Sequence, residues 1–144
     1  MFQFQLLTSE DIHEIIPLVK LINKSCTDEL LFQRFEEMFM QNYECVGVLS
    51  NEKLIGCCGL WFQTRHYSGR SVEPDHVVIL PEYRSQGLGK KLLDFCLKRA
   101  IDKGFDAMEL NCYLENEQGQ KFWEELGFVK LGYHSILPLS NKKT

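Results

Sequence analysis

The sequence predicts a single α/β domain over residues 1–144, in which one mixed sheet carries helices on both faces. The chain has 144 residues, the size of one ordinary domain and enough to bury a core. Hydrophobic residues make up 44% and charged residues 25%, which is typical of a globular chain rather than a disordered one. Segments with strand and helix patterns follow one another in the order βααβββαβαββ, and this order indicates a mixed sheet.

The chain begins with a strand pattern followed by two helix patterns. Apolar and polar residues alternate over residues 2–6, as in a strand. Thr8 supplies an N-cap for a helix that runs to Ile22, and Pro17 predicts a kink or a break inside it. A second helical pattern covers residues 27–39.

Three strand patterns follow, over residues 45–49, 54–64 and 72–80. Residues 50–53 form a turn between the first two strands. The turn signal Tyr67-Ser68-Gly69 precedes the third strand.

A long helix opens the second half of the chain. Its apolar residues recur at helical spacing from Gly87 to about Lys103, and Gly104 is expected to end it in the left-handed conformation. The remaining patterns are a strand, a helix and two short strands: 107–112, 116–126, and 127–139 around Gly132.

Charge and composition exclude several classes of function. The net charge is −4, so a broad nucleic-acid-binding face is not expected. No apolar run approaches the roughly 20 residues of a membrane span. Residues 1–7 carry no basic residue and do not resemble a signal peptide, so a cytoplasmic protein is expected.

The six cysteines are interpreted as small buried hydrophobic residues rather than as metal ligands. None forms a C-x-x-C pair, and Cys57 and Cys58 would point to opposite faces of a strand. His13 and His134 show no partner pattern for a metal either. No metal site is expected.

The loop between the strand 72–80 and the long helix predicts a phosphate-binding site. The start of a helix has unpaired N–H groups and the positive end of a dipole, so it attracts phosphate oxygens. Gly87 and Gly89 allow the backbone to approach a bulky diphosphate. Arg84 and Lys90 add positive charge beside them.

Two other glycine-rich loops fit this sequence less well. A Walker A loop needs Ser or Thr after its lysine, but Lys90 is followed by Lys91. A dinucleotide-binding fingerprint needs a third glycine, and the residue in that place is Leu92.

Arg84-Ser85-Gln86-Gly87-Leu88-Gly89 resembles the R/Q-x-x-G-x-G/A signature of the GNAT family of N-acetyltransferases. The resemblance extends to the strand before it, 77–84, and to the segment 116–128, which is similar to the family's N-x(5)-F-Y-x-x-x-G-F pattern. It implies a mostly antiparallel sheet whose central strands splay apart, with acetyl-CoA bound at the opening. The family also implies that a homodimer can form.

The resemblance assigns cofactor-binding roles to three parts of the chain. The backbone of Val77, Val78 and Ile79 would pair with the pantetheine arm, much as another strand would. The Asn116 side chain would reach the cofactor from the gap between the strands. The pyrophosphate would be held by Arg84 and by the amides of the loop: Ser85, Gln86, Gly87, Leu88, Gly89 and Lys90.

Direct attack of an amine on the thioester requires a general base, because a free alkylamine titrates near about 10. The family places an acid near the start of this strand, where the sequence has Glu73, Asp75 and His76. His76 suits proton transfer near neutral pH, while Asp75 and Glu73 could work through water. Asp75 is expected to alternate in facing with His76.

The family often protonates the leaving thiolate with a tyrosine, and Trp123 stands in that place. An indole N–H has no useful pKa for this task. Either another group such as Tyr133 or Tyr113 donates the proton, or CoA leaves as the thiolate, or catalysis is weak.

Three functions are therefore weighed. The leading one is transfer of acetyl from acetyl-CoA to a primary amine of a small molecule or peptide. The second is a catalytically weak CoA-binding regulatory module, and the third is an interaction domain that uses the aromatic hairpin around Trp61 and Tyr67.

Overall fold

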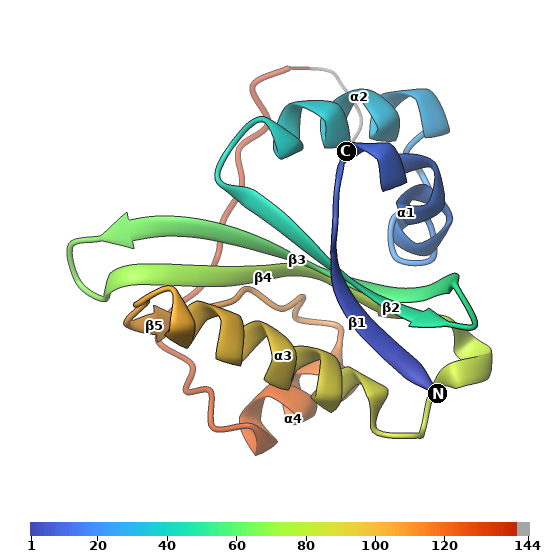
Figure 1. Ribbon diagram of the computed structural model, residues 1–144. Coiled ribbons are helices and arrows are strands. Elements are labelled where there is room, and N and C mark those ends of the chain that lie inside the picture. The colour runs from blue at the N-terminus through green and yellow to red at the C-terminus, as the bar shows by residue number, and fades with distance from the viewer. Residues whose placement is uncertain (141–144) are drawn as a thin grey trace.

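The computed structural model describes residues 1–140 and contains one sheet flanked by helices (Figure 1). In chain order, the elements are β1 (Phe2–Leu7), α1 (Ile12–Val19), α2 (Asp28–Phe39), β2 (Tyr43–Ser50), β3 (Lys53–Arg65), β4 (Gly69–Ile79), α3 (Leu88–Asp102), β5 (Ala107–Met108) and α4 (Glu117–Glu125). Short 3₁₀ turns at Ser9–Asp11 and Pro81–Tyr83 precede α1 and follow β4. None of the helices in residues 1–140 is both long and apolar enough to cross a membrane.

The five strands lie in the order β1-β2-β3-β4-β5. The pairs from β1 to β4 are antiparallel, because each consecutive strand returns through a short connection or past α1 and α2. Among the strands of residues 1–140, β4 and β5 form the one parallel pair, with α3 as their crossover. The expected mixed and mostly antiparallel sheet is thereby confirmed.

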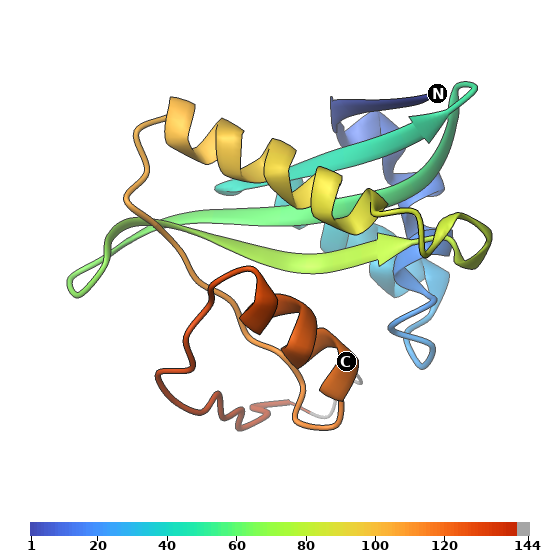
Figure 2. The ribbon, with the colours of Figure 1, turned by 90° about the horizontal axis from the view of Figure 1, so that it is seen from below.

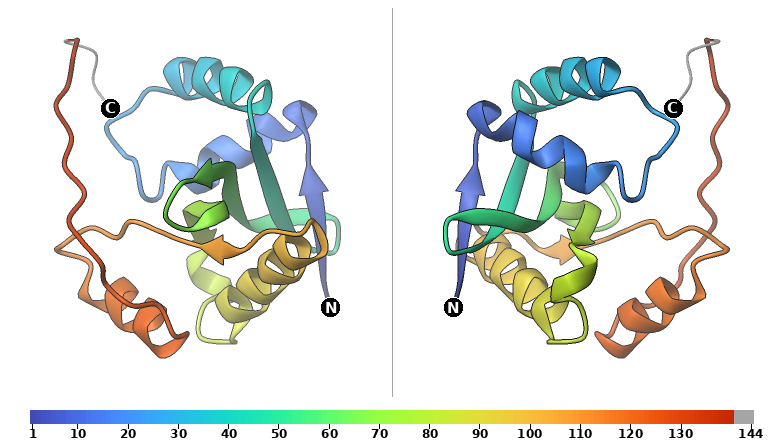
Figure 3. Two further views of the ribbon diagram at one scale, coloured as in Figure 1. Left: turned by 90° about the vertical axis from the view of Figure 1, so that its left-hand side faces the viewer. Right: turned by 90° about the vertical axis from the view of Figure 1, so that its right-hand side faces the viewer.

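The helices α1 and α2 cover one face of the sheet and α3 covers the other (Figures 1 and 3). Each face has its own core: Ile15 and Phe35 belong to the first, and Leu92 and Cys96 to the second. Cys57 packs into the first core and the adjacent Cys58 into the second, as strand alternation predicts. The two sides of the sheet are named the α1/α2 face and the α3 face after the helices that cover them.

The first helix is shorter than the sequence predicts. It passes through Pro17 and ends at Val19, whereas the pattern extended to Ile22. Pro17 lacks the N–H that would bond one turn back, so it weakens the helix near its end. The chain leaves the helix within three residues of the proline.

The helix α3 begins and ends where its glycines predict. Gly87 before it has φ 75° and Gly104 after it has φ 78°, both in the left-handed region that favours glycine. Arg99 fixes the helix to the sheet through two bonds of 2.6 and 2.7 Å to the Glu44 carboxylate on β2.

The last part of the chain differs from its predicted strands. The strand β5 has two residues instead of 107–112, and residues 127–139 form no strand. Only Ala107 and Met108 find partners on β4, so the residues after them have no ladder to join. The apolar alternation after Gly127 is present, but no strand lies beside it, and Leu131 and Tyr133 are 90% and 91% exposed.

Candidate active site

The strand β4 has a free backbone edge beyond its short pairing with β5. Ser71 and Val72 face Ala107 and Met108, and the Glu109 N–H donates to the Val72 carbonyl, after which the two segments separate. Figure 2 shows the chain leaving β4 at this point and leading to α4. Residues 74–79 of β4 therefore pair with β3 on one side and with no strand of residues 1–140 on the other. This is the splaying that the family resemblance implies.

A β-bulge interrupts β4 within this free stretch. Cys58 faces Val77 and Leu60 faces Pro74, so β4 advances three residues while β3 advances two. A proline suits such a position because it cannot donate to the ladder. The bulge changes the direction of the β4 backbone where β4 and β5 separate.

The bulge also overturns one expectation about side-chain direction. Asp75 and His76 were expected on opposite faces, but both reach the α1/α2 face. Asp75 accepts a bond of 3.1 Å from the Trp61 indole N–H, and the Trp61 ring lies 4.9 Å from Tyr43. His76 contacts Tyr43 directly. An inserted residue places two consecutive side chains on one face, which alternation alone does not anticipate.

The loop after β4 has the geometry of an anion cradle. Ser85 and Gly87 both have positive φ, 64° and 75°, and alternation of such residues turns successive N–H groups toward one point. The first bond of α3 runs from the Lys91 N–H to the Gly87 carbonyl. The N–H groups of Leu88, Gly89 and Lys90 therefore have no acceptor among residues 1–140, as at any uncapped helix start.

The space in front of this cradle is open. A Cβ placed on Gly87 would meet no atom within 4 Å, and one on Gly89 would meet only Phe122 of α4, at 3.9 Å. The Arg84 Nε donates to the Ile79 carbonyl at 2.9 Å, so this side chain ties the loop to the end of β4. The Lys90 ammonium pairs with Asp94 one turn along the helix.

Two carboxylates of β4 stand at the opening on the α1/α2 face. Glu73 accepts a 3.0 Å bond from Asn111, which follows β5, and a longer 3.5 Å bond from Gln63 on β3. Asp75 is exposed and accepts from Trp61. Within residues 1–140 the donors to both carboxylates are neutral, so each remains available to a cationic or proton-donating group.

A third carboxylate nearby is occupied. Glu109 accepts bonds from Ser71 at 2.6 Å, from Ser68 at 3.2 Å and from Tyr67 at 3.1 Å. The Ser71 bond above all holds the pKa of Glu109 below its usual range. This carboxylate fastens the tip of the β3–β4 hairpin to β5.

His76 is enclosed in the core rather than open to the site. Its side chain is 6% exposed, with Tyr43 Oη 2.5 Å from Nε2 and Cys57 Sγ 3.6 Å from Nδ1. Burial lowers the pKa of His76 below its usual value, and burial likewise raises the pKa of the Tyr43 phenol far above its own. Both rings are therefore neutral at pH 7, and a hydrogen bond joins Tyr43 Oη to His76 Nε2. The structure does not bring His76 to the opening with Glu73 and Asp75.

The buried His76 predicts that the protein loses stability in mild acid. Above pH 6.5 the imidazole is neutral in the folded and unfolded chains, but below it the unfolded chain takes up a proton that the folded chain excludes. The free energy of unfolding should then fall by up to about 1.4 kcal/mol per pH unit. Denaturant unfolding at pH 7.5, 6.5 and 5.5 measures this. His76→Asn should flatten the dependence, whereas the exposed His66→Asn should keep it, and equal slopes in both would contradict the assignment.

The remaining candidates lie on and beyond α4. The Asn116 Oδ1 accepts from the Gly119 N–H at 2.9 Å and caps this helix, a local role that leaves its predicted contact with a cofactor untested. Trp123 packs against Phe122 and Phe128. Tyr133 is 91% exposed and Tyr113 81%, and neither is held near Glu73. A proton-donating role for Tyr133 stays a prediction.

Several residues at the site carry no motif in the sequence. Asn111 holds Glu73, Tyr43 holds His76, and Gly59 lies opposite the bulge. Their roles depend on which strands become neighbours. The signal available in advance was Pro74 inside a strand pattern, which indicates a bulge or an edge.

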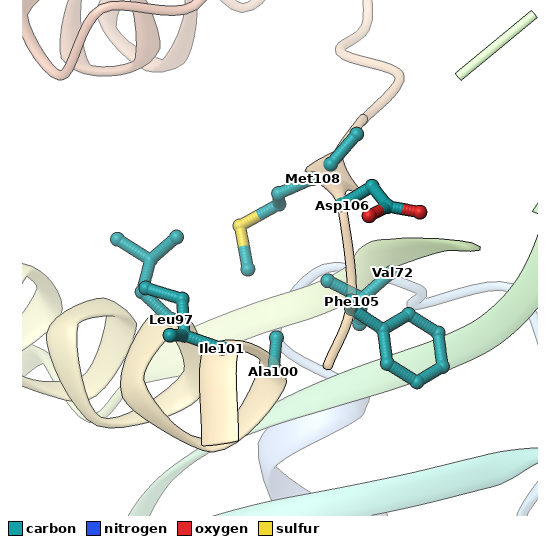
Figure 4. A pocket seen from close by; sticks show the side chains of 8 residues that line it. Val72, Leu97, Ala100, Ile101, Phe105, Asp106 and Met108 are labelled. Atoms are coloured by element: carbon teal, nitrogen blue, oxygen red, sulfur yellow. The ribbon is translucent and has the colours of Figure 1, made fainter. Parts of the chain in front are cut away.

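An apolar cavity of about 210 Å³ lies away from these residues, between the last turns of α3 and β5 (Figure 4). Leu97, Ile101 and Met108 line it, and it contains none of the candidate catalytic side chains. No group of three or more His, Cys, Asp or Glu side chains within residues 1–140 is arranged to hold a metal ion.

Comparison with known proteins places this arrangement in context. The model of the acetyltransferase (GNAT) family matches residues 10–128. An aminoalkylphosphonate N-acetyltransferase of Salmonella typhimurium strain LT2 is 26% identical over 127 residues, covering 84% of this chain and 80% of the relative. A thialysine N-epsilon-acetyltransferase of Bos taurus is 28% identical over 78 residues, covering 51% of this chain and 46% of the relative. The chain thus matches about half the length of the bovine protein.

A solved structure of an aminoglycoside N-acetyltransferase in complex with CoA shares the fold. It superposes with a TM-score of 0.84 and 18% identity, covering 99% of this chain and 96% of the other. The splayed strands and the loop before α3 therefore belong to a fold that recurs in proteins of this family.

Proposed function

This chain belongs to the GNAT acetyltransferase family, and on that premise we propose that it transfers an acetyl group from acetyl-CoA to a primary amine of a small molecule or a peptide. One observation carries the proposal: the free edge of β4 leads directly into a loop whose backbone N–H groups converge at the open start of α3. A strand edge that ends in an anion cradle fits a ligand with an amide-bearing arm and a diphosphate. The acceptors named for the relatives, thialysine, aminoalkylphosphonate and aminoglycoside, are all amines.

The chain would hold the co-substrate with backbone rather than with side chains. The edge at Val77, Val78 and Ile79 would pair with the pantetheine amides. The N–H groups from Ser85 to Lys90 would bind the pyrophosphate, with Asn116 at the far side of the opening. Arg84 would act by fixing the loop to Ile79 rather than by contacting phosphate.

Acetyl-CoA supplies the acetyl group as a thioester, which a neutral amine attacks directly. A C–N bond forms, the C–S bond breaks, and the amine proton passes to a base. We assign that base to Glu73, with Asp75 beside it as a second acceptor, because both stand at the opening and His76 does not. A β4 backbone N–H can stabilise the oxyanion.

No general acid is assigned to protonate the leaving thiolate. Trp123 occupies the expected tyrosine position and its indole cannot supply a proton. No hydrogen bond positions the hydroxyl of Tyr113 or Tyr133 within residues 1–140. We propose that CoA leaves as the thiolate and is protonated by water.

Release of free thiol from acetyl-CoA tests the function. The protein is incubated with polyamines, aminoglycosides, amino acids and N-terminal peptides, and amine-dependent thiol release is expected with at least one class. Acetyl-CoA should also raise the melting temperature, as binding to the folded state requires. An unchanged melting temperature and no thiol release would reject the proposal.

A second function is favoured by one observation, the presence of Trp123 where the family often has a tyrosine. A catalytically weak CoA-binding regulatory module would retain the cradle, so acetyl-CoA would raise the melting temperature without amine-dependent thiol release. That pair of results separates it from the enzyme.

A homodimer is also proposed for this chain. Six large apolar side chains between Val129 and Leu139 are at least 74% exposed, and a surface of this kind is usually covered by a partner. Light scattering after size exclusion should give the mass of two chains, and Leu131→Lys should shift it toward one. A monomer at all concentrations would reject the dimer.

A further inference from the structure

The bulge of β4 rests on an interior pair of polar side chains. Tyr43, at the start of β2, crosses beneath β3 so that its Oη lies 2.5 Å from His76 Nε2. Both side chains are buried, at 5% and 6% exposure, and the Phe35 ring packs edge-on against His76 at 5.5 Å. A buried histidine or tyrosine costs stability unless its polar atoms are hydrogen-bonded, so this bond holds His76 against Tyr43.

The strand between them leaves room for this contact at one residue. Gly59 of β3 lies opposite the bulge, between the paired residues Cys58 and Leu60. A Cβ on Gly59 would lie 2.5 Å from His76 Nε2 and 2.8 Å from Tyr43 Oη. Because Gly59 has no side chain, the Tyr43–His76 pair can occupy the space that a Cβ there would fill.

The pair is separated from the opening by a single backbone step. His76 is the residue after Asp75 and before Val77, within the free edge of β4 at residues 74–79. Any shift of the His76 ring moves the bulge, and with it the Asp75 carboxylate and the N–H groups along the edge. A displacement of about 1 Å at such groups lowers catalytic rates by up to about a hundredfold.

We propose that Tyr43 and His76, admitted by Gly59, are positioning residues that hold the β4 bulge in the geometry that acetyl transfer requires. This rests on the proposed function of the opening. The pair contacts neither substrate. It acts through the backbone, so the predicted consequence falls on the rate of transfer and on the mobility of β4.

Tyr43→Phe tests the role, because it removes the hydroxyl and keeps the ring. Turnover at saturating substrates should fall roughly ten- to hundredfold. The dissociation constant of acetyl-CoA should rise by a smaller factor than turnover falls, since the cradle at Gly87 is untouched and only the pairing along the β4 edge is disturbed. Deuterium exchange at the amides of residues 75–79 should be faster than in the wild type, while exchange in α3 stays the same.

Two controls separate positioning from stability. Ile15 lies in the same core and is 0% exposed. Ile15→Val should lower the melting temperature by a few degrees without changing turnover. Tyr67→Phe removes a hydroxyl bond to Glu109 outside the pair and should leave exchange at 75–79 unchanged. If Tyr43→Phe keeps wild-type turnover and exchange, or if Ile15→Val reproduces its effects, the positioning role is rejected.

A double-mutant cycle tests the contact itself. Gly59→Ala should lower the melting temperature by roughly 5 °C or more in the wild type, because its methyl strikes His76. In a background that carries both His76→Ala and Tyr43→Phe, which removes both close contacts, the same change should have little further effect, and additive losses would overturn the proposed packing. The exchange and melting measurements need no substrate. If the wild type acetylates no amine, the proposed function fails, while these two results still decide whether the pair holds the bulge.

Discussion

Gly87→Val is expected to weaken acetyl-CoA binding about a hundredfold while the chain still folds. Gly87 has φ 75°, and nothing within residues 1–140 lies within 4 Å of a Cβ added there, so a valine would project into the open space before the N–H groups of α3. Loss of one or two charge-assisted hydrogen bonds to a pyrophosphate, each about 1.5–3 kcal/mol, gives a change of this size. Calorimetric titration with acetyl-CoA measures it.

The other end of the same helix supplies a matched control. Gly104 has φ 78°, and a Cβ there would approach only the end of the flexible Arg70 side chain, at 3.3 Å. Gly104→Val therefore imposes similar backbone strain, on the order of 1–2 kcal/mol, away from the cradle. It should lower the melting temperature as Gly87→Val does and leave binding intact. Equal affinity in both variants would show that the pyrophosphate does not lie at Gly87.

The cradle was predictable because its determinants are local. A strand pattern, two glycines and the start of a helix occur within 72–89, and the left-handed Gly87 follows from chain chemistry near that residue. The same holds for Gly104 and for Thr27, whose side chain caps α2 by accepting from Leu30. In each case the residue that signals the feature also forms it.

The arrangement around His76 was not predictable in this way. A β-bulge forms where one strand has an extra residue relative to its partner, so it depends on the register of the two strands. The register of β3 against β4 is set by packing on both faces of the sheet. Once Pro74 is known to face Leu60 and Gly59 to lie opposite the bulge, the burial of His76 follows. Sequence alone favoured His76 and Asp75 as the base and kept Glu73 as a further candidate, because alternation placed Asp75 and His76 on opposite faces without showing which face is enclosed.

The two strands predicted over residues 127–139 do not form, for a related reason. The alternation of Val129, Leu131 and Tyr133 is a strand pattern, but a strand exists only where another strand accepts its hydrogen bonds. Within residues 1–140, β5 pairs at two residues and offers little edge to continue the sheet. The pattern thus identifies a segment suited to pairing, and the exposed side chains are those that a partner would cover.

Glu73→Gln should reduce turnover by about a hundredfold or more near neutral pH, the largest effect expected of any catalytic substitution here. Glutamine has the shape of glutamate and can still accept the bond from Asn111, so the local packing is retained while the base is lost. The dissociation constant of acetyl-CoA should stay within twofold. Steady-state rates with saturating amine measure the change.

Glu109→Gln is the control for a nearby carboxylate that the site does not use. Its oxygens accept from Ser71, Ser68 and Tyr67, so this change should lower the melting temperature and leave turnover within a few fold. Asp75→Asn tests the second acceptor at the opening. A large loss in Asp75→Asn together with a wild-type rate in Glu73→Gln would move the base to Asp75.

The pH dependence decides whether Glu73 removes a proton or merely orders the opening. The acceptor must be neutral to attack, and its neutral fraction grows tenfold per unit as the pH rises toward about 10. If Glu73 is the base, the deficit of Glu73→Gln should shrink steadily with rising pH, because solution then performs the deprotonation. If Glu73 only positions other groups, the ratio of wild-type to variant turnover should stay constant across the same range. A constant ratio would remove Glu73 from proton transfer and leave it, like Tyr43 and His76, a residue that acts through geometry.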